Sequence, residues 1–186
     1  VCRRKNLANK RLARPLLTKK AMKTMQNTQA RDLIQKKESL IQAFLAGEEP
    51  HFLEKLTRFL DEYFFTVYEK SIAARKMVAS QNPFAVIALG GYGRKEQCIH
   101  SDIDLLILFD ATVVPEVEAF VQELLYPLWD ARFEVGYAVR SIDECIAMAF
   151  DRFDILTTVL DARFICGHSL IYSAFKEKFR HRLSVK

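Results

Sequence analysis

Several features are scarce or absent in this chain of 186 residues. No apolar run approaches the roughly 18 residues that a membrane-spanning helix needs, so the sequence does not predict a membrane protein. The start of the chain has no apolar region of the kind found in secretory signals. The four cysteines, Cys2, Cys98, Cys145 and Cys166, show no C-x-x-C spacing, which argues against a zinc site or a disulfide framework. We therefore expect a globular protein of the reducing cytoplasm.

Acidic residues are missing from the first 23 positions, which hold nine Lys or Arg residues. The rest of the chain keeps 19 of the 28 basic residues against all 23 acidic ones, so the net charge of +5 conceals an acidic body. A basic tail can bind nucleic acid or an anionic membrane, but such a tail is more often a solvated terminus. We expect residues 1–29 to form a flexible basic segment.

Hydrophobic spacing predicts two helices before the centre of the chain. Apolar residues at helical intervals indicate one helix that ends near Gly47 and a second over about 52–79. Together they define a helical extension over residues 30–81. Pro83 then ends the helix and begins a strand.

The centre of the chain reads as two strands joined by a glycine-rich connection. An apolar run over 84–89 ends in Gly90 and Gly91, and a second apolar run begins directly after Asp102 and Asp104. Because side chains on a strand alternate between faces, the two aspartates are expected to lie on the same face.

This arrangement indicates a site for a metal–nucleoside triphosphate complex. Two neighbouring carboxylates repel each other unless a cation lies between them. Mg²⁺ binds one or two carboxylates and completes its shell with water and substrate phosphates. Gly90 and Gly91 lack a Cβ, so their backbone N–H groups can approach a polyphosphate closely.

The downstream pattern predicts one more strand and four helices. A helix is expected from Pro115 to Trp129, with Trp129 on its buried face, followed by a strand over 133–139. Ser141 and Glu144 form a capping box that begins a helix to about residue 150. Further helices are expected over 154–166, ending at Gly167, and over 169–183. Residues 82–140 thus form the predicted core, and 141–186 form C-terminal helices that pack on it.

These motifs resemble a known superfamily. Gly-Gly, a spacer and Asp-Ile-Asp are similar to the signature of the DNA polymerase β-like nucleotidyltransferases. The fuller strings over 90–94 and 101–106 most resemble the N-terminal catalytic domain of the bacterial protein-PII uridylyltransferase/uridylyl-removing enzymes. Segments that match the same branch follow over 128–130, 134–136, 139–141, 143–145 and 160–164, and Gly167 matches as well.

The resemblance implies a fold and an activity. The fold would be α+β, the polymerase β-like nucleotidyltransferase fold, with a short mixed β-sheet flanked by helices, an N-terminal helical extension and C-terminal helices. The activity would be the transfer of UMP from UTP to a tyrosine of the nitrogen-regulatory PII protein. It would depend on one or two Mg²⁺ ions, which Mn²⁺ can replace. The chain would be a fragment of a larger multidomain enzyme, without the His/Asp set for uridylyl removal and without the sensor modules for glutamine.

The resemblance also assigns residues. Asp102 and Asp104 would be catalytic metal ligands. The superfamily usually adds a third carboxylate, for which Glu134 is the matching acid. It would serve as a metal ligand or as the general base toward the incoming hydroxyl, and a salt-bridged strand residue is an equal alternative.

Four residues are candidates for nucleotide binding. Gly90 and Gly91 would present N–H groups to the β- and γ-phosphates, and Ser101 would add a hydroxyl donor. Arg94 is placed to neutralise the charge of the triphosphate with its planar guanidinium. For Arg140, a contact to the triphosphate or the acceptor competes on even terms with a salt bridge to Asp143 or Glu144.

Two other functions stay open at this point. Residues 95–97 read Lys-Glu-Gln where the uridylyltransferases usually show Gly-Glu-Leu. Glu-Gln at this place is similar to the nucleotidyltransferase-like domains attached to CBS or cyclic-nucleotide-sensing modules. The chain could thus be a regulatory module that binds a nucleotide without transferring it. Nucleotide addition to RNA is disfavoured, because RNA binding usually needs a basic face.

Overall fold

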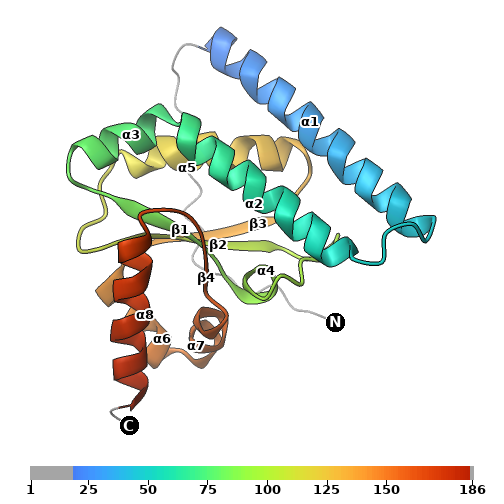
Figure 1. Cartoon of the computed structure of the whole chain (residues 1–186). Coiled ribbons are helices and arrows are strands. Elements are labelled where there is room, and N and C mark those ends of the chain that lie inside the picture. The colour runs from blue at the N-terminus through green and yellow to red at the C-terminus, as the bar shows by residue number, and fades with distance from the viewer. Residues whose placement is uncertain (1–18, 185–186) are drawn as a thin grey trace.

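The computed structural model describes residues 19–184. Helices and strands alternate irregularly along this range (Figure 1). In chain order they are α1 (Lys19–Leu45), α2 (Phe52–Lys70), α3 (Ile72–Ala79), β1 (Phe84–Ala88), α4 (Gly90–Gly93), β2 (Ile103–Phe109), α5 (Val117–Asp130), β3 (Val135–Ser141), α6 (Ile142–Asp151), α7 (Phe153–Leu160), β4 (Arg163–Gly167) and α8 (Ser169–Ser184). Within residues 19–184, no helix combines the length and the apolar character that a bilayer crossing requires.

The four strands form one mixed sheet in the order β3-β2-β1-β4. β1 is antiparallel to both β2 and β4, and β2 is parallel to β3. A parallel pair needs a long crossover connection, and α5 provides it between β2 and β3. The α+β class with a short mixed sheet flanked by helices is confirmed.

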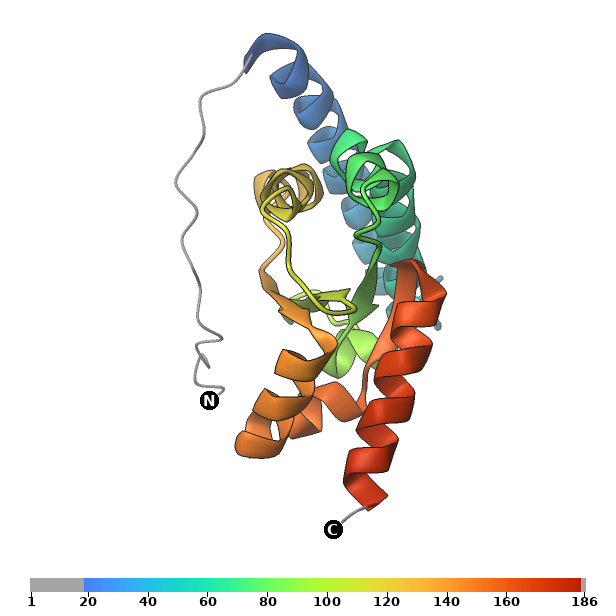
Figure 2. The ribbon, with the colours of Figure 1, turned by 90° about the vertical axis from the view of Figure 1, so that its left-hand side faces the viewer.

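Helices cover both faces of the sheet (Figure 2). α1, α2, α3 and α5 pack on one face, where Ile103, Leu105 and Ile107 of β2 join their core. α6, α7 and α8 pack on the other face, which receives Leu106 and Leu108. Because side chains alternate along β2, this strand contributes residues to two separate hydrophobic cores.

Aromatic side chains connect the sheet to α2 and α5. The ring of Phe84 on β1 lies 4.8 Å from the ring of Phe120 and 5.5 Å from that of Phe109, measured between centroids. Tyr68 of α2 meets Phe84 and Phe120 edge-on. Each such pair adds about 0.5–1.5 kcal/mol beyond the area that it buries. This cluster fixes β1, and with it the turn that follows, against the helical layer.

Several predicted elements are confirmed with changed boundaries. The strands expected over 84–89, after Asp104 and over 133–139 are β1, β2 and β3. The capping box of Ser141 and Glu144 begins α6 as predicted. The long helix expected over 52–79 is divided at Ser71, whose side chain accepts a hydrogen bond from the Ala74 amide and caps α3. The glycine-rich connection begins with a short helical turn, α4.

The helix predicted over 154–166 is wrong in its second half. α7 ends at Leu160, and Arg163–Gly167 form β4 on the outer side of β1. Residues 141–186 therefore hold a strand of the core sheet as well as helices. The local sequence suits a helix, but pairing with the free side of β1 satisfies the backbone there, and tertiary context overrides such a weak propensity.

Two further expectations need correction. Residues 1–18 of the segment predicted to be flexible lie outside the described residues, but residues 19–29 are helical and begin α1. Good helix formers such as Ala, Met, Lys and Gln dominate this stretch. Trp129 was expected in the core but is 42% exposed, because its neighbour Leu128 takes the buried position in the last turn of α5.

The packing of β4 against β1 can be tested at Gly167, with Gly47 as a control. Both glycines have a left-handed φ, +98° and +75°. A Cβ at Gly167 would lie 2.4 Å from the Phe84 carbonyl oxygen, whereas one at Gly47 would meet nothing within 4 Å. In urea unfolding, Gly47→Ala should cost about 1 kcal/mol from backbone strain. Gly167→Ala should cost about 3 kcal/mol or more, because overpacking adds to the strain. Equal losses would contradict this packing.

Candidate functional site

The carboxylate of Asp104 lies between two glycines, one in the turn after β1 and one on β3. On one side, the Leu89 amide donates to the Asp104 carbonyl oxygen at 2.9 Å, which places the turn at Gly90 beside β2. On the other side, Asp104 is paired in register with Gly136 of β3. A Cβ on Gly90 would lie 3.3 Å from Oδ2 of Asp104, and one on Gly136 would lie 2.9 Å from Oδ1. The carboxylate therefore occupies space that these two residues leave by having no side chain.

Burial and charge both act on this carboxylate. Burial raises the pKa of Asp104 to about 6, and repulsion from the Asp102 carboxylate contributes to a smaller extent. Asp102 is exposed and lies two residues earlier, at the end of the loop that leads into β2. Neither aspartate forms an ion pair with a residue in the described range. The pair thus forms a partly buried negative site with no cationic side chain to balance it.

The two carboxylates suit a hard divalent cation. Their oxygens are the ligands that Mg²⁺ prefers, and a bound cation would offset both the burial and the mutual repulsion. No group of three or more His, Cys, Asp or Glu residues in the described part of the chain is arranged to hold a metal. A Mg²⁺ ion here would take Asp102 and Asp104 as its protein ligands and complete its shell with water and phosphate oxygens.

Glu134 directly precedes β3, the strand beside β2. The Ile103 amide donates to its carbonyl oxygen at 2.8 Å, and the parallel register pairs Ile103 with Val135. Side-chain alternation places position 134 on the same face as Gly136, the face of Asp104. The Glu134 side chain is exposed and forms no ion pair with a described residue. Its part as third carboxylate or base stays a prediction.

Arg94 is engaged with two acids at the edge of the glycine turn. Its Nη1 lies 2.5 Å from Asp161 and its Nε lies 2.8 Å from Glu96. These contacts, with Glu96 the larger cause, raise its pKa above the usual value. The guanidinium is half-exposed, and a phosphate would compete with these two carboxylates for it. Its contact with the triphosphate stays a prediction.

Ser101 closes the loop that leads into Asp102. Its hydroxyl accepts hydrogen bonds from the Cys98 amide at 3.0 Å and from Nε2 of Gln97 at 2.8 Å. Nε2 of Gln97 also donates to the Ser101 carbonyl oxygen at 2.9 Å, and this glutamine is almost fully buried. Ser101 thus stabilises the loop through its hydrogen bonds to Gln97 and Cys98. Its contact with phosphate stays a prediction.

Arg140 makes no ion pair with Asp143 or Glu144. Glu144 completes the capping box with the Ser141 amide, and Asp143 pairs with Lys178 at 3.1 Å. No other ion pair to Arg140 is found among the described residues. The salt-bridge alternative is therefore wrong, and the guanidinium is available on β3.

A family model matches the central part of the chain. Residues 35–140 match the family described as "Putative nucleotidyltransferase DUF294". The chain belongs to this family. The matched residues include Gly90, Gly91, Asp102, Asp104 and Glu134.

Curated relatives extend the match within the nucleotidyltransferases. The bifunctional uridylyltransferase/uridylyl-removing enzyme of Rhodospirillum rubrum is 37% identical over 138 residues, which are 74% of this chain and 14% of that protein. The enzyme of the same name from Azospirillum brasilense is 41% identical over 96 residues, 52% of this chain and 10% of the relative. That from Caulobacter vibrioides is 40% identical over 95 residues, 51% and 10% respectively. The chain thus spans a small part of these relatives, and the resemblance to their branch is confirmed.

Some residues of this candidate site escaped the sequence analysis. Gly136 makes room for Asp104, and the Thr158 methyl group on α7 would lie 3.9 Å from a Cβ on Gly90, so α7 borders the turn. Gln97 anchors the loop before Asp102. For Gln97 the departure from the usual Gly-Glu-Leu was a signal, but α7 came beside the turn only through the fold.

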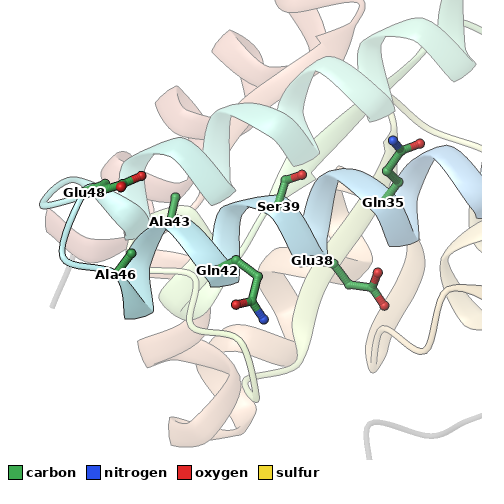
Figure 3. A pocket seen from close by; sticks show the side chains of 7 residues that line it. All are labelled: Gln35, Glu38, Ser39, Gln42, Ala43, Ala46 and Glu48. Carbon is green, nitrogen blue, oxygen red and sulfur yellow. The ribbon is translucent and has the colours of Figure 1, made fainter.

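A groove lies along α1 and the turn that follows it (Figure 3). It has a volume of about 570 Å³, and its walls come from α1 and the turn after it: Gln35, Glu38, Ser39, Gln42, Ala43, Ala46 and Glu48. None of the predicted site residues lines it.

The raised pKa of Asp104 predicts a pH-dependent penalty in metal-free protein. Between pH 3.8 and about 6 the folded state binds more protons than the unfolded state, so this group lowers stability as the pH rises through that window. Asp104→Asn should therefore raise the free energy of unfolding by about 1–2 kcal/mol at pH 7.5, with the gain disappearing near pH 4. Urea unfolding in EDTA measures this. Asp110→Asn, an exposed change directly after β2, is the control.

Proposed function

We propose that this domain catalyses metal-dependent nucleotidyl transfer, with UTP as the donor and a tyrosine hydroxyl of a PII-type signalling protein as the acceptor. The observation that carries the proposal is the Asp104 carboxylate held between Gly90 and Gly136, with Asp102 beside it. Membership of a nucleotidyltransferase family and relatives named as uridylyltransferases support the choice of reaction and donor.

The two aspartates would hold Mg²⁺. When bound, the ion would supply charge neutralisation for the triphosphate and polarise the phosphorus that is attacked. Asp104, half-enclosed by glycines, has little freedom to move, whereas the exposed Asp102 can adjust to the substrate. Pre-positioned carboxylates of this kind lower the reorganisation needed during the reaction.

The glycine turn would bind the phosphates. At the start of α4, Gly90 and Gly91 have backbone N–H groups without an intrahelical acceptor, which a phosphate oxygen can satisfy. Arg94 would add charge by exchanging one of its carboxylate partners for phosphate, and Ser101 keeps the loop before Asp102 in place. Arg140 would meet the triphosphate or the acceptor protein.

Glu134 would accept the proton of the tyrosine hydroxyl. As that proton moves to the Glu134 carboxylate, the phenolic oxygen forms a bond to the α-phosphorus and the bond to the departing pyrophosphate breaks. An exposed acid directly before β3 is accessible to an incoming protein chain. A folded part with more acidic than basic residues supports a protein acceptor over a nucleic acid.

The same proposal places the protein in bacterial nitrogen regulation in the cytoplasm, as the catalytic part of a larger chain. A regulatory module that binds a nucleotide without transfer is not favoured, since the relatives are named as transferases. Its remaining support is the Gln97 departure, which in the structure serves to anchor a loop.

Nucleotide binding tests the aspartates directly. Isothermal titration should find Mg²⁺-dependent binding of UTP, tighter than of ATP, CTP or GTP. An Asp102→Asn/Asp104→Asn variant should lose it by at least about 100-fold, because both protein ligands of the cation are neutralised. Asp110→Asn should bind as the wild type does. Binding that ignores both Mg²⁺ and the two aspartates would refute the metal site, and preference for ATP would refute the donor.

Glu134→Gln separates a base from a metal ligand. For a base, the transfer of UMP to PII should fall about 100-fold or more, with the affinity for Mg²⁺–UTP within about twofold of the wild type. For a metal ligand, both should fall. Glu177→Gln, an exposed change on α8, is the control. Unchanged transfer would show that Glu134 is only a surface residue of the strand.

A further inference from the structure

Three side chains from three elements meet behind the glycine turn. Asp61 comes from α2, Tyr92 from α4 and Arg163 from β4. The Tyr92 hydroxyl donates to Oδ1 of Asp61 at 2.6 Å. Arg163 binds the same carboxylate with two nitrogens, at 2.8 Å to Oδ2 and 3.1 Å to Oδ1. One carboxylate therefore joins residues that lie 31 and 102 positions away along the chain.

Arg163 also holds the backbone of the turn. Its Nη2 donates to the Tyr92 carbonyl oxygen at 3.2 Å, and its Nε donates to the Gly93 carbonyl oxygen at 3.2 Å. The guanidinium carbon lies 5.3 Å from the centre of the Tyr92 ring. A planar guanidinium can serve a carboxylate and two carbonyls at once, which a lysine ammonium on a flexible stem cannot do in the same geometry.

The network is largely shielded from water. Tyr92 is 1% exposed, and burial, followed by the Asp61 charge, raises its pKa well above the usual value, so it remains a neutral hydrogen-bond donor. The Asp61 and Arg163 side chains are 29% and 20% exposed. Charge-assisted hydrogen bonds in such surroundings are stronger than those at an open surface.

The turn has little room to move around these contacts. A Cβ on Gly93 would lie 2.1 Å from the Asp161 carbonyl oxygen, so the backbone of the turn touches the segment before β4. Tyr92 packs into the core on the α2 side, with its ring 5.9 Å from that of Phe64. Gly90, two residues earlier, meets Asp104 instead. The turn is thus held from behind while its front faces the carboxylates.

We propose that Asp61 is a positioning residue of the nucleotide site. Through Tyr92 and Arg163 it fixes the backbone of the glycine turn, so that the N–H groups of Gly90 and Gly91 point toward the phosphates. This role rests on the proposed nucleotide binding, and it assigns to α2 a part in that binding. The hydrogen-bonded order of the turn itself can be measured without any nucleotide.

The first test is amide hydrogen exchange of nucleotide-free protein. The amides of Gly93, Arg94 and Glu96 donate to carbonyls within the turn and report its opening. Asp61→Asn should speed their exchange about tenfold or more, and leave the amides of β2 and β3 unchanged. Asp143→Asn is the control, since it breaks an exposed carboxylate–lysine pair on α6 and α8. Tyr92→Phe removes a single hydroxyl and provides a milder variant if Asp61→Asn fails to fold by circular dichroism.

The second test measures binding of Mg²⁺–UTP and of Mn²⁺ alone. Asp61→Asn and Arg163→Lys should weaken Mg²⁺–UTP binding about 10- to 100-fold, because small displacements of phosphate-binding groups have effects of this size. Their Mn²⁺ affinity, which depends on Asp102 and Asp104, should stay within about twofold. If the two residues served folding alone, the substitutions would not weaken Mg²⁺–UTP binding while leaving Mn²⁺ binding intact. The comparison of the two affinities therefore distinguishes positioning from general stability.

Two outcomes are decisive in opposite ways. If the wild type binds no Mg²⁺–nucleotide, the proposed function fails, and the nucleotide role of Asp61 fails with it. If the wild type binds Mg²⁺–UTP but the folded Asp61 and Tyr92 variants match Asp143→Asn in both exchange and affinity, the role of Asp61 alone is overturned.

Discussion

The carboxylate of Asp104 lies between two residues without side chains, Gly90 on the turn after β1 and Gly136 on β3. The central position of β2 makes this close approach unavoidable, since strands on both sides bring their backbones to about 5 Å. The same enclosure partly removes the carboxylate from water, which raises its pKa. The close approach of the neighbouring backbones thus explains both why glycines flank the Asp104 side chain and why its pKa is raised.

The two faces of the sheet have different tasks. The face toward α1, α2, α3 and α5 carries the larger core, including the aromatic cluster around Phe84, and it anchors β1 and Tyr92. The opposite face, toward α6, α7 and α8, carries Asp104. On this side α7 borders the glycine turn. A rigid core on one side of the strands is a suitable support for charged groups on the other, because close-packed interiors resist displacement.

The structure also changes the meaning of residues that the motif suggested for phosphate binding. Arg94 and Ser101 each have partners within the protein, so their first effect is on the shape of the turn and of the loop before Asp102. Arg163 does similar work on the turn from β4, outside the range that matches the family. Much of what surrounds the two aspartates is therefore support for backbone geometry, on which close binding of a polyphosphate depends.

The sequence alone determined the elements whose signals are local. Alternation placed Ile103 in the core and Asp104 on the opposite face of β2, the glycines marked the turn, and the capping box of Ser141 began α6, because each depends on neighbours within a few residues. Only the tertiary structure decided that residues 163–167 form a strand on the free side of β1, and that Asp61 meets Arg163 across 102 positions. Such contacts depend on which segments the whole fold brings together, and no local pattern carries that information.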